Sequence, residues 1–460
     1  MEKDTICAIS SPLGVSGIGI VRLSGDETYR IIEEIFVPGK NPFKKKKFKI
    51  ENIQSHTVHY GHIVDNGKVI DEVIVVIMKS PKSYTREDMA EIGCHGGLIP
   101  LKEVLNLCIK KGARLAYPGE FTKRAFLNGR IDLIQAESIL DIIYSKTEEG
   151  LEIGIKKLKG QLSEFISKIR DRIFNLLVLL EAKINFPDEE DISELSLDYR
   201  KEIESIIEEI ENFLSKSNKG KLIKNGVNVA IIGKANVGKS SLLNAFLKED
   251  RAIVTEIPGT TRDAIVEVIN IKGIPVNIID TAGIREAKNK IERIGIEKSL
   301  EWMKKAEINL LMIDGSTKLN DYDFKLMENI KEKPYLIIIN KIDLPQKAEI
   351  EKIYEKFPEN RIVKASIKNG IGIQDIENKI WEIINEGFGE IKGDEIYLNL
   401  RQENKINMVK YYLKQVLNEE MVEIVAENLK NCLNEIDELI GNKFSEKILD
   451  EIFSNFCIGK

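Results

Sequence analysis

The sequence has few cysteines and no long apolar segment. Its five cysteines in 460 residues include no Cys-x-x-Cys pair, which argues against a disulfide framework and favours a reducing compartment. The opening Met-Glu-Lys-Asp lacks the basic start and apolar core of a signal peptide. No apolar run is long enough to span a bilayer. We therefore expect a cytoplasmic protein that does not enter a membrane.

A large excess of charge of one sign is also missing. The formal net charge is −6, so binding of nucleic acid would need a local basic patch. The four lysines at 44–47 are one candidate for such a patch, and a solvated loop is the alternative. The length is enough for about three domains.

The segment 233–240, Gly-Lys-Ala-Asn-Val-Gly-Lys-Ser, matches the phosphate-binding P-loop. The apolar run before it, 227–232, predicts a buried strand, and 241–247 predicts the start of a helix. Glycines let backbone N–H groups approach phosphate oxygens, and the helix start adds the positive end of its dipole. Lys239 would contact the outer phosphates, and Ser240 would bind Mg²⁺. A glycine-rich turn without a ligand is the alternative.

A second motif indicates which base is bound. The segment 340–343, Asn-Lys-Ile-Asp, follows the apolar run 334–339, which predicts another buried strand. The Asp343 carboxylate can accept two hydrogen bonds from the N1–H and amino group of guanine, whereas adenine has no such donor pair. Hydrogen bonds to a charged group contribute roughly 1.5–3 kcal/mol each, so the motif favours guanine.

Two further loops complete a predicted magnesium and γ-phosphate site. Asp280 follows the predicted strand 274–279 and would hold the Mg²⁺ shell. The Gly283 N–H would contact the γ-phosphate, and Thr261 would be a second Mg²⁺ ligand in a loop that this phosphate orders. All four motifs occur in order and at strand ends, which indicates a GTPase.

Hydrolysis needs a group that orients the attacking water, and the usual glutamine is replaced. Ile284 follows Gly283, and an apolar side chain cannot orient water. Either hydrolysis is slow or another group acts. Glu292 is a candidate, and a first-turn helix acid is its alternative role. No arginine finger in cis is identifiable; Arg262 and Arg285 are candidates, and salt bridges remote from the phosphates are their alternative role.

The first 118 residues predict a mixed α/β domain. Strand patterns cover three segments, 18–23, 57–64 and 69–78. His95, in Cys-His-Gly-Gly at 94–97, is expected in a turn that enters a helix. A catalytic pair of Cys94 and His95 is conceivable, but no third group that would orient it is evident in the sequence.

Helical patterns lie on both sides of the nucleotide motifs. They include predicted helices at about 198–215, 400–434 and 445–453. The simplest account is one helical domain interrupted by an inserted G domain. We expect four segments: a domain at 1–118, a first helical part at 119–221, the G domain at 222–385, and a second helical part at 386–460.

Short motifs along the whole chain resemble one family, the tRNA modification GTPase MnmE, also called TrmE. They are Gly-Ile-Val-Arg-Leu-Ser-Gly at 19–25, His-Gly-Gly at 95–97, Pro-Gly-Glu-Phe at 118–121, Arg-Ala-Phe-Leu-Asn at 124–128, Asp-Leu at 132–133 with Gln-Ala-Glu at 135–137, Phe-Pro-Asp-Glu-Glu at 186–190 and Phe-Cys-Ile-Gly-Lys at 456–460. The resemblance implies a multidomain fold, α/β plus all-α. Its parts would be an N-terminal α/β folate-binding and dimerisation domain, a helical domain, and an inserted Ras-like P-loop G domain with a doubly wound sheet.

The resemblance also implies an activity and partners. Such proteins hydrolyse GTP and work with a flavin-dependent partner, MnmG, so that FAD enters only through the partner. Together they add a carboxymethylaminomethyl or aminomethyl group to C5 of the wobble uridine of certain tRNAs. A 5-formyl- or methylene-tetrahydrofolate would be the one-carbon donor. The expected assemblies are a homodimer and a heterotetramer with MnmG.

Four residues match the family's folate site by motif: Arg22, Glu91, Arg130 and Lys460. Arg130 stands where some members have lysine, which keeps the charge but changes the geometry. Cys457, in the C-terminal tail, is a candidate catalytic nucleophile for the uridine ring, although no activating base is visible near it in the sequence.

The family's GTPases use K⁺ in place of an arginine finger. The matching K⁺ ligands are Asn236, Thr255, Ile257 and Thr260, and Glu292 matches the catalytic acid. The guanine-contacting loop usually has Ser-Ala where this chain has Ser-Ile at 366–367, and the larger side chain can shift that loop. The predicted GTP contacts are Asn236, Val237, Gly238, Lys239, Ser240, Ser241, Thr255, Glu256, Ile257, Pro258, Gly259, Thr260, Thr261, Asp280, Thr281, Ala282, Gly283, Asn340, Lys341, Asp343, Ser366, Ile367 and Lys368.

Two other functions stay open at this point. One is a regulatory GTPase switch that binds RNA or ribosomes without modifying them. The other is a scaffold whose G domain drives dimer closure while a partner performs the chemistry. A plain switch needs neither the folate-site residues nor the Cys-x-Gly-Lys tail.

Overall fold

The computed structural model describes residues 4–43, 48–185, 199–247, 266–280, 301–389 and 395–460. Tertiary contacts divide the chain into two compact units. Unit 1 contains Met1–Leu140, Lys157–Leu179 and Leu429–Lys460, and unit 2 contains Asp141–Lys156 and Leu180–Asn428.

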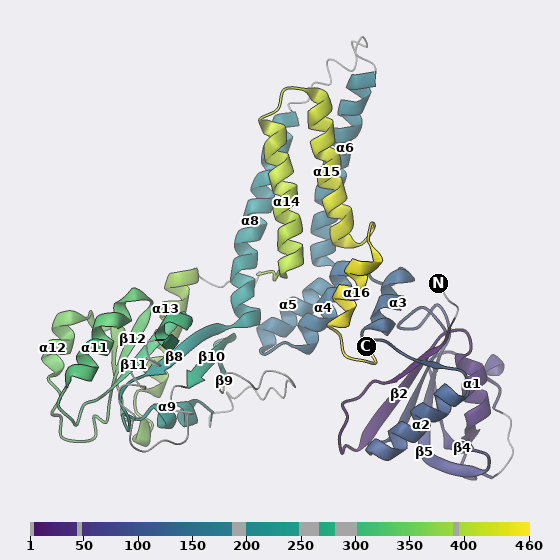
Figure 1. Ribbon diagram of the computed structural model, residues 1–460, viewed down its shortest axis with the longest axis horizontal. Coiled ribbons are helices and arrows are strands. Elements are labelled where there is room, and N and C mark those ends of the chain that lie inside the picture. Colours follow the sequence, from purple (N-terminus) through teal and green to yellow (C-terminus); the bar gives the residue numbers. More distant parts are fainter. Residues whose placement is uncertain (1–3, 44–47, 186–198, 248–265, 281–300, 390–394) are drawn as a thin grey trace. The chain divides into compact units, whose positions relative to one another are not determined.

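Unit 1 contains a seven-stranded mixed sheet (Figure 1). Its strands lie in the order β3-β4-β5-β6-β2-β1-β7, and only β1 and β7 pair in parallel. The bounds are β1 Ile6–Ile9, β2 Ile18–Ser24, β3 Phe36–Pro38, β4 Thr57–Asp65, β5 Lys68–Met78, β6 Met89–His95 and β7 Arg114–Leu115. The three predicted strands are confirmed as β2, β4 and β5.

The two faces of this sheet pack differently. On one face, α1 (Thr28–Ile35) and α2 (Leu98–Lys110) bury their apolar sides against alternate strand residues such as Val21 and Leu23. Because side chains alternate along a strand, Arg22 lies on the opposite face. There α3 (Glu120–Leu127) covers the sheet and Phe121 packs against Ile6.

The C-terminal helix and tail dock within unit 1. Phe453 of helix α16 (Glu446–Ser454) and Phe456, just after it, lie in a core with Phe126 of α3 and Leu133 at the start of α4 (Leu133–Ile143). Gly119 has φ of +67°, and a Cβ there would lie 2.7 Å from the Phe453 carbonyl oxygen. The backbone of α16 therefore lies too close to position 119 for any residue larger than glycine.

Unit 2 contains a six-stranded sheet in the order β13-β12-β11-β8-β10-β9, parallel except for the pair β9–β10. The bounds are β8 Val227–Ile232, β9 Val266–Ile271, β10 Ile274–Asp280, β11 Ile308–Asp314, β12 Tyr335–Asn340 and β13 Ile362–Lys364. Helices α9 (Lys239–Phe246) and α13 (Ile373–Phe388) pack on one face, and α11 (Asp321–Asn329) and α12 (Ile350–Lys356) on the other (Figure 1). This arrangement confirms the doubly wound, Ras-like G domain.

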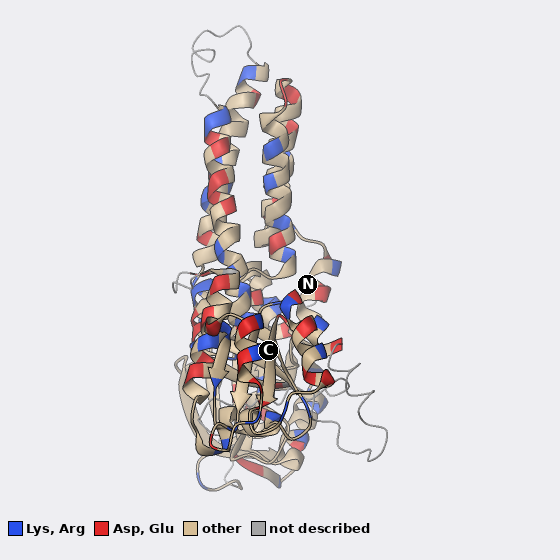
Figure 2. Cartoon of the chain, turned by 90° about the vertical axis from the view of Figure 1, so that its left-hand side faces the viewer, with Lys and Arg blue, Asp and Glu red and all other residues tan. Residues whose placement is uncertain are grey.

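The remaining α-helices of the described chain include several long ones. Besides α4 they are α5 Glu148–Leu158, α6 Gln161–Asn185, α8 Tyr199–Asn225, α14 Leu400–Leu417 and α15 Val422–Ile440. Acidic and basic residues are interspersed along them (Figure 2), and pairs such as Lys221–Glu403, at 2.6 Å, join α8 to α14. Among the helices described, none is both long and apolar enough to cross a bilayer.

Two predicted helix boundaries were wrong. The helix expected at 198–215 continues to Asn225, because buried residues such as Leu222 and Ile223 extend its apolar side. The helix expected at 400–434 is two helices, α14 and α15. Asn418 ends the first, and the Glu419 carboxylate then accepts hydrogen bonds from the next two backbone N–H groups.

Candidate nucleotide and folate sites

The P-loop connects β8 to α9, as the sequence predicts. Gly233, Asn236 and Gly238 have φ of +145°, +62° and +110°, which is a conformation that glycine and asparagine accept most easily. Gly238 directly precedes α9, so the loop ends at the positive end of a helix dipole. The residues present fit a bound phosphate group.

The Lys239 ammonium lies over this loop. Its Nζ donates to the carbonyl oxygens of Gly233 and Lys234 at 2.7 and 2.6 Å. The adjacent Ser240 and Ser241, in the first turn of α9, are exposed. The loop thus presents an ammonium group and serine hydroxyls together, as phosphate and Mg²⁺ binding require.

Asn340, at the end of β12, ties the P-loop to the base-binding loops. Its Nδ2 donates to the Val237 carbonyl oxygen at 2.7 Å, and its Oδ1 accepts from the Ile367 N–H at 3.1 Å. Only 3% of Asn340 is exposed. A Cβ at Gly238 would collide with this amide. The sequence placed Asn340 among the guanine contacts and missed this bridging role.

Asp343 is exposed, and one of its carboxylate oxygens accepts from the Ser366 hydroxyl at 2.6 Å. Lys341 pairs with Asp314 of β11 at 2.6 Å. Burial raises the pKa of Asp314, but the hydrogen bonds from Lys341 and Ser316 outweigh it and hold that pKa below its usual value. Both motif side chains thus have a partner within the protein, Ser366 for Asp343 and Asp314 for Lys341.

Ile367, which is larger than the alanine usual at this position of the guanine-contacting loop, packs into the core. The Ile367 side chain is buried beside Ile373 and Ile376 of α13, and only 6% of the residue is exposed. Its N–H still reaches Asn340. The loop thus keeps its connection to the P-loop, and Lys368 beside it is exposed.

Several predicted residues lie outside the described part of the chain. They are Thr255, Glu256, Ile257, Pro258, Gly259, Thr260, Thr261, Arg262, Thr281, Ala282, Gly283, Ile284, Arg285 and Glu292. Asp280 ends β10, and its side chain is also outside the description.

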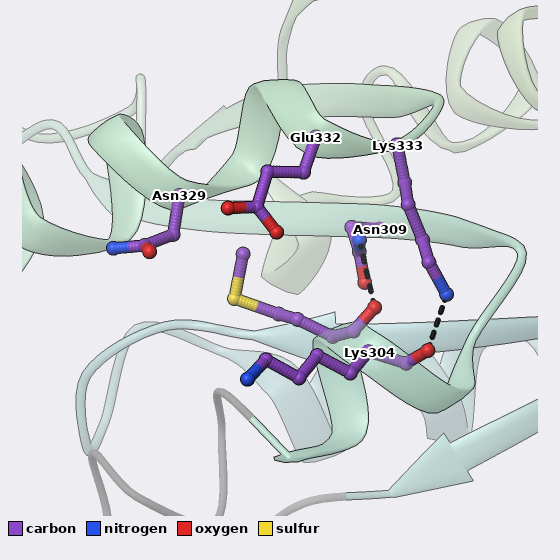
Figure 3. Close-up of a pocket in the computed structure, with 6 residues that line it drawn as sticks. Lys304, Asn309, Asn329, Glu332 and Lys333 are labelled. Atoms are coloured by element: carbon purple, nitrogen blue, oxygen red, sulfur yellow. Dashed lines mark hydrogen bonds between the residues drawn. The ribbon is translucent and has the colours of Figure 1, made fainter.

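A small cavity lies at the opposite end of the same sheet (Figure 3). Its volume is about 30 Å³, and its lining is Met303, Lys304, Asn309, Asn329, Glu332 and Lys333. Asn309 is near the amino end of β11, whereas the nucleotide loops follow the carboxyl ends of the strands. A water molecule needs roughly 10–15 Å³ of such volume, so this cavity is sized for solvent and not for a nucleotide.

In unit 1, β2 and β6 bring together residues matched to the folate site. Arg22 faces Glu91 in the strand register, and the two side chains form an ion pair at 2.8 Å. The Arg22 guanidinium carbon lies 5.7 Å from the centre of the Tyr84 ring and 5.6 Å from that of Phe121. The exposed Arg130 lies 4.6 Å from the same Tyr84 ring.

The C-terminal tail reaches this group. The Gly459 carbonyl oxygen accepts from Arg22 Nη1 at 2.9 Å and from the Ser10 hydroxyl at 3.1 Å. Lys460 follows and is partly exposed, and Cys457 is exposed. Three of the matched residues are thus linked directly or through Tyr84, and the tail places Lys460 next to the residue that contacts Arg22.

The prediction that Cys94 and His95 could form a catalytic pair is wrong. The two residues are neighbours on β6, so their side chains point to opposite faces of the sheet. Cys94 is buried, and burial raises its pKa to about 12. His95 is instead held by Asp71, whose Oδ1 lies 2.6 Å from its Nδ1, a partner the sequence did not reveal.

A larger cavity, of about 650 Å³, lies beside α3. Its lining is Asp4, Gly25, Asp26, Glu87, Arg114, Tyr117, Pro118, Glu120, Lys123, Arg124, Leu127, Asp450, Phe453 and Ser454. The helix residues at 120, 123, 124 and 127 share one side of α3, whereas Phe121 contacts Arg22 from another. Most of the lining charges pair with each other. Glu120, for example, accepts from Arg114 at 2.7 Å and from Arg124 at 3.1 Å. We interpret this network as structural.

The network predicts loss of stability in acid. Burial raises the pKa of Glu120, but hydrogen bonds from Arg114, the Tyr117 N–H and Arg124 together lower it below the usual value. A lowered pKa in the folded state gives stability that is present above the unfolded-state value of about 4 and is lost as the pH falls through the folded-state value. Glu120→Gln should reduce the free energy of unfolding at pH 7 by about 2 kcal/mol.

Urea unfolding of both proteins between pH 7 and pH 3 checks this. The difference between wild type and Glu120→Gln should shrink as the pH falls. Glu103→Gln, a change at an exposed position of α2, is the control and should behave as wild type. A difference independent of pH would contradict the role of the Glu120 charge.

Comparison with known proteins covers the whole chain. A family model described as "GTP-binding protein TrmE N-terminus" matches residues 5–130, and one described as "MnmE helical domain" matches residues 133–457. The chain is 44% identical over 472 residues to the tRNA modification GTPase MnmE of Thermoanaerobacter pseudethanolicus, with 100% of both chains covered. It is 43% identical over 466 residues to that of Alkaliphilus oremlandii, with 99% of each covered.

Among solved structures, the chain is similar to Era of Aquifex aeolicus bound to GDP·AlF₄⁻. That likeness has a TM-score of 0.28 and 30% identity, over 43% of this chain and 69% of the other. The assignment depends on the full-length sequence relatives and the two family models. By these matches, and by the resemblance of its motifs, the chain belongs to the tRNA modification GTPase MnmE family.

Proposed function

We propose that this chain hydrolyses GTP as part of a tRNA modification reaction. The observation that carries the proposal is the Asn340 bridge, which joins the P-loop to the base-binding loops in a chain whose full-length relatives are named tRNA modification GTPases. In this proposal Lys239 binds the outer phosphates, and Asp343, oriented by Ser366, binds guanine. Mg²⁺, held by Ser240 and by Thr261, would neutralise charge on the phosphates.

The finer proposal concerns the modification itself. We infer that the chain acts in the cytoplasm with an MnmG-type flavoprotein to add a carboxymethylaminomethyl or aminomethyl group to C5 of the wobble uridine. A tetrahydrofolate derivative would bind at Arg22, Glu91, Arg130 and Lys460. Cys457 is proposed only as a candidate nucleophile for the uridine ring. The four domain segments, the homodimer and the heterotetramer belong to the same proposal.

A regulatory switch that modifies nothing is the alternative. Such a protein needs the nucleotide loops of unit 2 but has no use for an arginine–glutamate pair held by the C-terminal tail. The contact of Arg22 with the Gly459 carbonyl oxygen, at 2.9 Å, therefore favours the enzyme.

A hydrolysis assay tests the GTPase. The full chain with Mg²⁺ should release phosphate from GTP and not from ATP. Lys239→Ala should lower GTP affinity at least tenfold, because the ammonium contacts with phosphate oxygens are lost. Lys368→Ala, at an exposed position beside the base-binding loop, tests the proposed Lys368 contact with the base and should have a smaller effect. Equal use of ATP and GTP would contradict the proposal.

Folate binding is expected to depend on Arg22 and on the tail. Arg22→Ala, and separately deletion of residues 459–460, should weaken binding of 5-formyltetrahydrofolate at least tenfold, because each change removes a cation and breaks the contact between Arg22 and the tail. GTP affinity should not change, since the nucleotide loops are in the other unit. Calorimetry with both ligands checks this, and normal folate affinity in both variants would contradict the site.

A further inference from the structure

Tyr84, in the loop between β5 and β6, contacts both arginines of the proposed folate site. The guanidinium carbons of Arg22 and Arg130 lie 5.7 and 4.6 Å from the centre of its ring. A cation this close to an aromatic face is attracted by the ring, by about 0.5–1 kcal/mol at exposed positions. One ring therefore holds two positive charges at the same site.

The ring itself is held in place from α3. The Tyr84 hydroxyl lies 2.8 Å from the hydroxyl of Thr122, which is fully buried. The ring also packs against the apolar group that contains Phe121 and Met89. These contacts restrict the position of the Tyr84 ring.

The two arginines differ in what else they contact. Arg22 is paired with Glu91 and donates to the tail. Arg130 is exposed, and within the described residues its guanidinium forms no ion pair and has only the Tyr84 ring as a partner. A free arginine side chain loses about 2 kcal/mol of rotamer entropy when it is fixed. An arginine that already packs on an aromatic ring loses less rotamer entropy when it binds an anion.

We propose that Tyr84 is a positioning residue that holds Arg130 for the carboxylate end of the folate ligand. The Arg22–Glu91 pair, which offers a hydrogen-bond donor and an acceptor, then faces the heterocyclic end of the same ligand. This inference rests on the proposed folate site and adds the orientation of the ligand within it.

Two variants separate the ring from the hydroxyl. Tyr84→Leu removes the aromatic face, and Tyr84→Phe keeps it and loses only the contact with Thr122. Calorimetry with 5-formyltetrahydrofolate should show about tenfold weaker binding for Tyr84→Leu and less than threefold for Tyr84→Phe. The matched control is Tyr117→Leu, since the Tyr117 ring also lies over an arginine, Arg114 at 4.8 Å, but outside this site. It should bind folate as wild type does.

The decisive probe is the amide of 5-formyltetrahydropteroic acid, which has the same heterocycle and p-aminobenzoyl group but no carboxylate. Tyr84→Leu should bind this probe as tightly as wild type does, because the probe offers Arg130 no carboxylate in either protein. An equal loss for both ligands, or no loss for either, would overturn the inference. If wild type binds neither ligand, the proposed folate site fails and the inference fails with it. GTP affinity and the unfolding midpoint, measured for each variant, distinguish these outcomes from misfolding.

Discussion

Asp343→Asn is expected to weaken GTP binding by about 100-fold or more. The carboxylate would lose two hydrogen bonds from the guanine edge, each worth roughly 1.5–3 kcal/mol because the acceptor is charged. The amide nitrogen of asparagine would also face a guanine N–H, so two donors would oppose each other. Xanthosine triphosphate has a carbonyl in place of the amino group, so selection against it should relax. Titration with fluorescent GTP and XTP analogues measures both effects.

Two controls define what this result means. Ser366→Ala leaves the Asp343 charge but removes the hydroxyl that orients it at 2.6 Å, and should weaken GTP binding by roughly 3–10-fold, the value of one ordinary hydrogen bond. Asp26→Asn, at an exposed position of unit 1, should have no effect. Unchanged GTP affinity in Asp343→Asn would show that another residue recognises the base.

GTP hydrolysis is expected to be much faster in K⁺ than in Na⁺. Ile284 cannot orient water, and charge develops between the β- and γ-phosphates during transfer. An arginine finger that offsets this charge is worth roughly 10³–10⁵ in rate. Asn236 is exposed in the P-loop with φ of +62°, and we propose that its side-chain oxygen helps to hold K⁺ there. The other proposed ligands, Thr255, Ile257 and Thr260, lie outside the described residues.

Rates in KCl and NaCl at matched ionic strength test this proposal. Asn236→Ala should remove the difference between the two salts, whereas Glu292→Ala should slow hydrolysis in both without weakening nucleotide binding. Equal rates of wild type in the two salts would exclude the K⁺ role and favour Arg262 or Arg285 as the finger.

The strands around the nucleotide were predictable because their side chains are buried on both faces. Such strands are continuous apolar runs, as at 227–232 and 335–339, and the runs appear directly in the sequence. Helix ends were less predictable. The break after Asn418 depends on one local capping interaction, and the extension of α8 to Asn225 depends on packing against other elements.

Motif residues could be named from the sequence, but their partners could not. Arg22 and the Gly459 carbonyl oxygen are 437 positions apart, and Asn340 meets Val237 across 103 positions. Periodicity and spacing report only local structure, so contacts of this length appear only in the folded chain. For the same reason the sequence did not show that Asp71 holds His95 or that Tyr84 contacts two arginines.

Mass spectrometry of tRNA nucleosides decides whether this GTPase modifies tRNA. Transfer RNA would be compared from cells that have the protein, cells that lack it, and cells that carry Lys239→Ala. We expect the C5-modified wobble uridine to disappear without the protein, to return with wild type, and to stay absent or strongly reduced with Lys239→Ala. An identical set of modified uridines in all three would contradict this expectation.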